Sequence, residues 1–231
     1  MVIANTDQGN HARADELVTL RDVARTFVAH RSPQVMAIGI VVAVALRLGV
    51  GGGFGWADLA VAVVTLALTG VVEWFIHLFL LHAPEDSIRM TKFDTGTNHR
   101  KHHLDPPSVQ WLMLCWKDVI VFQVMLAVWN LTWPIVLALA FGAPIVATYL
   151  SAVLGAYLML AHYEWTHLLA HTRYRPKLPY YRRLAQNHRL HHFRNEHYWL
   201  GVTSNVGDRL LRTLPASKSD VPLSDTARTL S

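Results

Sequence analysis

Ten of the fourteen histidines are grouped in a way that indicates metal binding. They form two pairs and two triplets, in the order pair, triplet, pair, triplet along the chain. Residues at i, i+3 and i+4 of a helix share one face, so each group directs several imidazoles to one place. Imidazole is the commonest metal-binding side chain near neutral pH. The candidate metal ligands are His77, His82, His99, His102, His103, His167, His171, His188, His191 and His192.

The number of histidines predicts two metal ions with open coordination sites. Ten nitrogen ligands are too many for one ion, but two ions would receive five each, which leaves one position open on an octahedral iron. A structural zinc site would instead be closed by four ligands. An open site beside a membrane suits the activation of O2 next to a lipid chain. We therefore expect two iron ions as cofactors, for which zinc can substitute in the isolated protein, and O2 as a co-substrate.

Two acidic residues and two further histidines are candidates for supporting roles. Glu73 and Glu164 each share a helix face with a candidate ligand and lie in apolar runs, where a carboxylate is costly without a partner. We interpret them as groups that accept the second N–H of an imidazole and fix its tautomer, with direct metal ligation as the alternative. His162 and His197 each lie five residues from a candidate ligand and could support the site in the same way.

The composition and charge indicate a membrane protein with no nucleic-acid partner. Of the 231 residues 52% are hydrophobic, and these are concentrated in long runs. A net charge of +5 could indicate nucleic-acid binding in a soluble protein, but here the basic residues flank the apolar runs, as at a membrane surface. The single cysteine, Cys115, excludes an intramolecular disulfide and a cysteine-rich metal site.

These runs predict an all-α membrane protein, in which four transmembrane helices carry a cytoplasmic helical cap that holds the dimetal site. The four-span domain is expected to cover residues 35–214. Residues 1–34 would form a cytoplasmic segment, with a helix at 15–30 that either lies on the membrane or packs on the domain. Residues 215–231, rich in Ser, Thr, Asp and Pro, are expected to form a disordered tail. The expected spans are residues 35–50, 57–81, 119–141 and 145–169.

The distribution of basic residues predicts how the chain is oriented. All but one of the 21 Lys and Arg residues precede the first span, lie between the second and third, or follow the fourth. The exception, Arg47, is expected to extend to the lipid headgroups at the outer end of the first span. The positive-inside rule then places both termini and residues 82–118 in the cytoplasm. With a helix rise of about 1.5 Å per residue, both histidine pairs reach the cytoplasmic edge, where all four groups can converge.

Four stretches around these histidines resemble the membrane fatty acid hydroxylase/sterol desaturase superfamily. The resemblance covers about residues 60 to 214. The stretch 200–208, Leu-Gly-Val-Thr-Ser-Asn-Val-Gly-Asp, is similar to the fatty acid 2-hydroxylase branch. The four stretches are Glu73-Trp-Phe-Ile-His77 with His82, Asn98-His99-Arg-Lys-His102-His103, Glu164-Trp-Thr-His167 with His171, and Asn187-His188-Arg-Leu-His191-His192-Phe193.

The resemblance implies an O2-dependent di-iron enzyme in which the ten histidines hold the metal. Such an enzyme inserts one oxygen atom into an unactivated C–H bond, using electrons from an external donor. The 231 residues leave no room for a fused cytochrome b5 domain, so a ferredoxin, a reductase or a cytochrome b5-like protein would supply the electrons. No catalytic residue is expected beyond the metal ligands, because the metal carries the chemistry.

The substrate and the class of protein leave alternatives open. A fatty acyl or sphingolipid-type lipid is the first expectation, followed by a carotenoid and then a sterol, and desaturation could occur at the same site. The stretch 183–192 also resembles bacterial carotenoid hydroxylases. A metal transporter would need polar ligands near the middle of the bilayer. A bis-histidine haem protein would have no use for adjacent histidines, and a catalytically inactive metal-binding scaffold is the remaining alternative.

Overall fold

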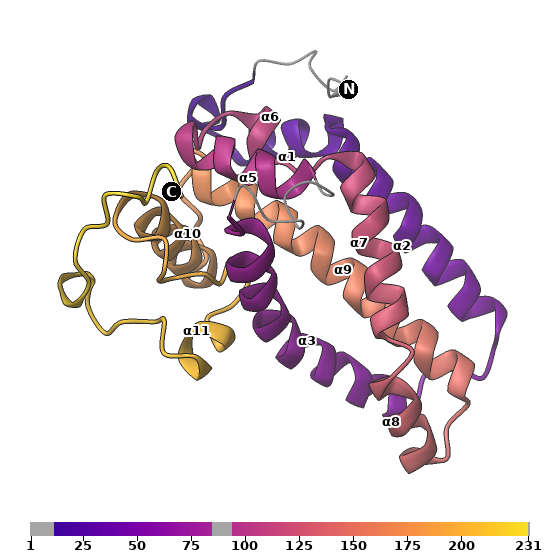
Figure 1. The fold of residues 1–231 in the computed structure, drawn as a ribbon. Coiled ribbons are helices and arrows are strands. Elements are labelled where there is room, and N and C mark those ends of the chain that lie inside the picture. Colours follow the sequence, from indigo (N-terminus) through magenta and orange to yellow (C-terminus); the bar gives the residue numbers. More distant parts are fainter. Residues whose placement is uncertain (1–11, 85–93, 231) are drawn as a thin grey trace.

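The computed structural model describes residues 12–84 and 94–230, and this part of the chain contains helices and no β-strand. The predicted all-α class is therefore confirmed. The long helices lie side by side, and several short ones gather at one end of them (Figure 1). The elements are η1 (Ala14–Glu16), α1 (Leu20–Ala29), α2 (Arg31–Gly49), α3 (Trp56–Ile76), η2 (His77–Leu81), α5 (Asp94–Leu104), α6 (Val109–Leu112), α7 (Trp116–Trp129), α8 (Trp133–Phe141), α9 (Ile145–His171), α10 (Pro179–Phe193), α11 (Val206–Leu210) and η3 (Lys218–Asp220).

Four stretches are long and apolar enough to cross a membrane, as the sequence predicted. Many of their large apolar side chains point away from the protein, and Val41 and Val63 are more than half exposed. A surface of this kind is unfavourable in water and favourable against lipid. The cytoplasmic location of the two termini stays a prediction. The four stretches are Arg31–Gly49, Trp56–Leu81, Val109–Trp129 and Ile145–His171.

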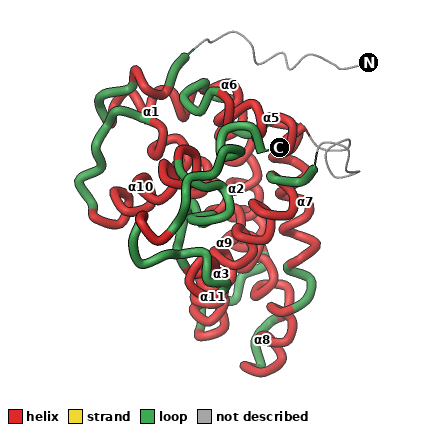
Figure 2. Tube along the Cα trace, turned by 60° about the vertical axis from the view of Figure 1, so that its left-hand side comes forward, coloured by secondary structure: helices red, strands yellow, loops and turns green. Residues whose placement is uncertain are grey.

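Helix α9 is the centre of the bundle. It packs against α2, α3, α7, α8 and α10, and it runs diagonally between α3 on one side and α2 with α7 on the other (Figure 1). Helices α5, α6 and α10 gather near the carboxyl end of α9, and α8 lies at the opposite end of the bundle (Figure 2). The histidine-bearing elements are therefore all at one end.

The apolar run 119–141, which the sequence predicted as one continuous span, forms two helices. Helix α7 ends before Asn130, whose side-chain amide donates to the carbonyl of Leu126 at 2.7 Å. Pro134 stands in the first turn of α8, where its missing N–H leaves no hydrogen bond unmade. Because Pro134 has no N–H to donate to the carbonyl of Asn130, four residues earlier, and its ring would clash with that carbonyl, one helix cannot continue from α7 into α8.

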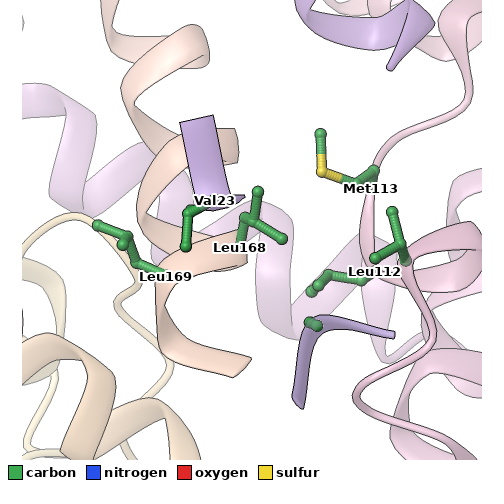
Figure 3. Packing of buried hydrophobic residues seen from close by; sticks show 7 residues of the cluster. Val23, Leu112, Met113, Leu168 and Leu169 are labelled. Atoms are coloured by element: carbon green, nitrogen blue, oxygen red, sulfur yellow. The ribbon is translucent and has the colours of Figure 1, made fainter. Parts of the chain in front are cut away.

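Helix α1 packs on the protein, which is one of the two alternatives for this segment. Thr19 begins it with a reciprocal capping box to Asp22. The side chain of Val23 is fully buried and lies beside Leu168 and Leu169 of α9, as Figure 3 shows. Phe27 adds an edge-to-face contact with Trp165, with ring centroids 5.3 Å apart. The helix therefore covers the end of α9 near the histidines.

Arg47 is buried in the protein and does not extend to the lipid headgroups as predicted. Its side chain is 3% exposed and pairs with Asp58 at 3.1 Å. Its Nε donates to Ser151 Oγ at 2.8 Å, and its other nitrogens donate to the carbonyls of Gly51 and Gly53. A buried charge is tolerated only when it is paired and hydrogen-bonded, and these contacts meet that condition while joining α2, α3 and α9.

Residues 215–230 are ordered against the protein, in contrast to the disordered tail predicted from their composition. Val221 and Ala227 are 1% and 3% exposed. Much of the segment is held by hydrogen bonds to its backbone, such as the one that Arg194 Nε donates to the carbonyl of Val221 at 2.8 Å. A low content of large apolar residues does not reveal this kind of anchoring, because the side chains that provide it belong to other elements.

Candidate metal centre

The ten candidate ligands form two groups of five in the structure, which is the division that their number suggested. Within each group, one nitrogen from every histidine lies within 4.8 Å of the others. The first histidine group is His77, His82, His99, His103 and His191. The second histidine group is His102, His167, His171, His188 and His192.

Each triplet contributes to both groups, and helix geometry explains how. Successive residues of an α-helix are about 100° apart, so residue i+4 lies about 40° to one side of residue i and residue i+3 about 60° to the other. On α5, His99 and His103 join the first group, and His102 joins the second. On α10, the i and i+4 residues join the second group and His191 joins the first. The H-x-x-H-H spacing therefore suits a helix that lies between two sites.

A π-helical turn brings together the first pair, His77 and His82. In an α-helix, residues five apart point about 140° away from each other. Here η2 is a π-turn, and the N–H of His82 donates to the carbonyl of His77 at 3.1 Å. The wider turn places the two rings 4.8 Å apart. Turns of this type are rare and occur often at functional sites, and the sequence reasoning did not foresee this one.

The ring nitrogens are spaced as ligands of one ion would be. Two nitrogens about 2.1 Å from an ion and at right angles to each other are about 3.0 Å apart. His192 Nε2 lies 3.1 Å from His102 Nε2 and 3.0 Å from His188 Nε2. In the first group, the Nε2 atoms of His99 and His103 are 3.2 Å apart. A hydrogen-bonded pair would explain one such distance but not the convergence of three nitrogens.

Burial keeps these imidazoles neutral and available to a metal. Nine of the ten side chains are buried and His82 is half-buried. Burial lowers the pKa of His102, His188 and His192 well below 6.5, and the neighbouring imidazoles lower it further. Only the neutral form of the ring has a free lone pair, so a depressed pKa favours ligation.

Eight buried ring nitrogens of the candidate ligands have no hydrogen-bond partner among the described residues, although buried polar atoms are normally paired, and five of the eight are Nε2 atoms. A metal ion in each group would give these Nε2 atoms their partner. The donor set of neutral imidazoles, all at one end of the bundle, therefore fits a pair of transition-metal ions. The five atoms are Nε2 of His77, His82, His167, His171 and His191.

Three candidate ligands of the first group are oriented by backbone carbonyls. In each case Nδ1–H donates to a carbonyl oxygen, which fixes the tautomer and leaves Nε2 facing the group. Such outer contacts orient a metal-binding imidazole and raise its basicity. The acceptors are backbone atoms and carry no side-chain signal, so the sequence could not identify them. The three bonds are His77 to Leu200 (2.6 Å), His191 to Tyr198 (2.9 Å) and His103 to Ala227 (2.8 Å).

Glu73 does not accept an imidazole N–H as predicted. Its carboxylate accepts from the backbone N–H of Val202 and from the N–H and hydroxyl of Thr203. These donors lie on the loop 198–203, which carries two of the orienting carbonyls. The loop has several backbone N–H groups to satisfy, and it lies on the helix face that Glu73 shares with His77. Glu73 therefore holds the loop whose carbonyls orient two of the candidate ligands.

Glu164 also lacks the predicted contact with an imidazole. It accepts from Ser32 Oγ at 2.5 Å and from the backbone N–H of Leu114 at 2.9 Å. The carboxylate thus joins α9 to the start of α2 and to the segment between α6 and α7. It fixes the end of α9 that carries the second histidine pair.

Asp208 is a supporting residue for which the sequence suggested no role. Its carboxylate accepts from the backbone N–H of Leu200 at 2.9 Å, from that of Gly201 at 2.8 Å and from Thr213 Oγ1 at 2.6 Å. A Cβ atom at Gly201 would lie 2.0 Å from the carbonyl oxygen of Ser204, so only glycine fits. Asp208 therefore holds residues 200 and 201 of the loop 198–203, and Glu73 holds residues 202 and 203.

His162 and His197 lie outside both histidine groups. His162 Nε2 is 3.3 Å from the hydroxyl of Tyr181. The side chain of His197 is 66% exposed, with Nε2 3.5 Å from the carboxylate of Glu196. The described structure shows no hydrogen bond from either residue to a candidate ligand, so their supporting role is not borne out.

An apolar cavity runs through the bundle to the first histidine group. It has a volume of about 890 Å³ including its open mouth, and it lies between α3, α7, α8 and α9. His77, Glu73 and Tyr163 line one end, and Trp129 and Trp133 line the other. Most of the remaining wall is Leu, Val, Ile, Ala, Met and Phe. A lining of this kind is typical of a site for an apolar ligand.

Comparison with known families identifies the class of protein. The family described as fatty acid hydroxylase matches residues 62–213, a range that includes all ten candidate ligands and both supporting carboxylates of the loop. The chain belongs to the fatty acid hydroxylase family. This confirms the predicted resemblance.

Individual relatives agree with this assignment. The chain is 29% identical over 154 residues to the dihydroceramide fatty acyl 2-hydroxylase FAH2 of Arabidopsis thaliana, over 65% of this chain. It spans 60% of the length of that relative. Its fold is similar to that of full-length Scs7p, of which only the hydroxylase domain is visible, with a TM-score of 0.57 and 23% identity over 90% of this chain and 70% of that one.

Proposed function

We propose that this protein is a membrane-bound di-iron hydroxylase that inserts one oxygen atom from O2 into an unactivated C–H bond of a lipid. A fatty acyl or sphingolipid-type chain is the proposed substrate, and an external protein supplies the electrons. The observation that carries the proposal is the apolar cavity, because His77 of the first histidine group forms part of its wall. Family membership and the 2-hydroxylase relative support the same reaction class.

The dimensions of the cavity suit an extended acyl chain. Thr65 and His77 both line it and are twelve residues apart on one helical stretch, which corresponds to about 18 Å at a rise of about 1.5 Å per residue. Apolar side chains along this length would bind the chain by excluding water. The bound lipid would then present a carbon beside the histidines, with its polar end near the same end of the bundle.

Iron bound by the two groups would supply the activation of O2 and the oxidising power that the reaction needs. The protein contributes position and shielding. The backbone carbonyls of the loop 198–203 keep the imidazoles of His77 and His191 in their ligating orientation. Tyr163 and Leu114 line both this cavity and a smaller pocket that also includes His99 and His167, and their side chains would limit the access of water to the reacting carbon.

A basic surface next to the second histidine group is the proposed docking place for the electron donor. Residues 172–195 contain no Asp or Glu. Charge complementarity would attract an acidic ferredoxin, reductase or cytochrome b5-like protein, and product formation would then slow as salt is raised. We place this surface, together with both termini, on the cytoplasmic side. The exposed basic residues are Arg173, Arg175, Lys177, Arg182 and Arg183.

The function is tested by expressing the protein in cells fed with ¹⁸O2 and measuring lipids by mass spectrometry. We expect hydroxylated acyl chains that contain one labelled oxygen. The variant Ala156→Phe would fill the cavity, which Ala156 lines, and should abolish the product while metal content stays normal. Val146→Phe, on the exposed side of the same helix, is the matched control and should remain active.

Other outcomes would identify the alternatives. Labelled oxygen in a carotenoid or a sterol would show that the protein acts on the substrate of another branch of the superfamily. Iron-loaded protein that yields no oxygenated product would favour a metal-binding scaffold. Ala156→Phe with wild-type activity would refute the cavity as the substrate site.

A further inference from the structure

The last ten described residues, 221–230, form a strap across the histidine-bearing end of the bundle. This C-terminal strap lies beyond residue 213, where the family match ends. The end of the chain lies beside α5 and α10 (Figure 1). We propose that the C-terminal strap is a positioning element of the metal centre, which fixes His103 as a ligand of the first histidine group. The inference rests on the proposed dimetal function.

The central contact joins the strap directly to a candidate ligand. His103 Nδ1–H donates to the carbonyl oxygen of Ala227 at 2.8 Å. Both residues are buried, with exposures of 0% and 3%. The bond holds the proton on Nδ1, so the lone pair is on Nε2, which lies 3.2 Å from Nε2 of His99. The strap therefore acts on His103 as the loop 198–203 acts on His77 and His191.

The residue after Ala227 holds the strap in register. Arg228 Nε donates to the carbonyl of His103 at 2.8 Å, and its Nη2 donates to the carbonyl of Leu104 at 2.5 Å. These are the last carbonyls of α5, which have no partner within the helix and carry its partial negative charge. The side chain of Arg228 and the carbonyl of Ala227 thus hold the same residue, His103, from two directions.

Further contacts connect the strap to both triplet-bearing parts of the fold. Glu196, just beyond α10, accepts from Ser224 Oγ at 3.0 Å and from Thr226 Oγ1 at 2.5 Å. Arg100 of α5 donates to the carbonyl of Leu230 and, with its other terminal nitrogen, to that of Ala83 at 2.7 Å. Because the strap is anchored on both sides of Ala227, a shift of one residue would remove the acceptor from His103.

The strap serves one histidine group and not the other, which makes the proposal distinguishable from general stabilisation. His103 belongs to the first group only. Loss of an outer contact of this kind typically weakens metal affinity by about 10–100-fold. A variant that detaches the strap should therefore release one ion per chain more readily and retain the other. A strap that merely stabilised the fold would affect both ions together with the unfolding temperature.

The experiment measures bound metal per chain in the full-length purified protein during dialysis against a chelator. We expect the metal content of Arg228→Ala to fall from about two ions per chain to about one under conditions in which the wild type keeps both. The ion of the first histidine group should be released about 10–100-fold faster than in the wild type. Arg228→Lys can still donate to one carbonyl and should lie between the two. Lys218→Ala removes a charge from an exposed position in the same terminal segment and should behave as the wild type.

A double variant completes the test. His103→Ala should show the same one-ion pattern, and adding Arg228→Ala to it should have no further effect if both act through one ligand. Arg228→Ala that keeps two ions at the wild-type rate would overturn the proposal, and so would parallel loss of both ions with a lowered unfolding temperature. Wild-type protein that binds no metal would instead refute the dimetal centre on which the inference rests.

Discussion

Replacing Asp208 with asparagine should destabilise the protein and loosen its hold on metal, without removing any candidate ligand. The carboxylate accepts three hydrogen bonds, two of them from backbone N–H groups of the loop 198–203. An asparagine at this position keeps one acceptor oxygen and replaces the other with an NH2 group. That group would face a buried backbone N–H, most simply that of Gly201, and leave it unpaired.

The expected decrease in the free energy of unfolding follows from these contacts. A hydrogen bond to a charged group contributes about 1.5–3 kcal/mol, and a buried donor left without an acceptor costs about 1–3 kcal/mol. Burial raises the pKa of Asp208 in spite of its hydrogen bonds, so the negative charge is itself disfavoured there and the neutral amide recovers part of the loss. We therefore expect a decrease of about 2 kcal/mol in the free energy of unfolding.

Two measurements check this prediction. Denaturant unfolding in detergent gives the free energy, and chelator-driven release gives metal affinity, which should fall because Leu200 presents its carbonyl to His77. Asp225→Asn removes the same charge at an exposed position and should match the wild type. If Asp208→Asn stays within about 0.5 kcal/mol of the wild type and releases metal at the same rate, the loop does not position His77.

Two further predictions concern pH and the buried arginine. Burial lowers the pKa of His99, His188 and His191 well below 6.5. Below about pH 6.5 these side chains are therefore protonated in the unfolded chain and remain neutral in the folded chain. Metal-free protein should therefore lose about 1.4 kcal/mol per such histidine for each pH unit below about 6.5, and a flat unfolding profile from pH 7 to pH 5 would contradict this. Arg47→Ala should cost about 3–5 kcal/mol because it leaves Asp58 unpaired. The double variant Arg47→Met with Asp58→Leu should recover much of that loss in thermal unfolding, and equal losses would exclude the unpaired charge as the cause.

Side-chain chemistry at regular spacing made the core of the site predictable. The H-x-x-H-H triplets and the histidine pairs have an obvious helical periodicity, and their number alone suggested five ligands per ion, which the two groups match. The apolar runs predicted four candidate spans for the same reason. Each of these inferences depends only on residue type and on the geometry of an element that the residues themselves form.

The features that the sequence did not reveal depend on backbone atoms and on partners distant in the chain. The acceptors at Tyr198, Leu200 and Ala227 are carbonyl oxygens, which every residue possesses. Glu73 shares a helix face with His77, but that face also meets the loop 198–203. Backbone N–H groups of this loop donate to the carboxylate of Glu73. The π-turn at η2 likewise results from packing, because no residue in it is specific to that geometry.

The interleaving of the two triplets has a mechanical consequence. Helices α5 and α10 each supply side chains to both histidine groups, so neither helix can rotate or slide to adjust one ion without disturbing the other. The relative position of the two ions would thus be set by α5 and α10 together. Under the proposed function, the movement that admits a lipid would then come from the walls of the cavity rather than from these two helices.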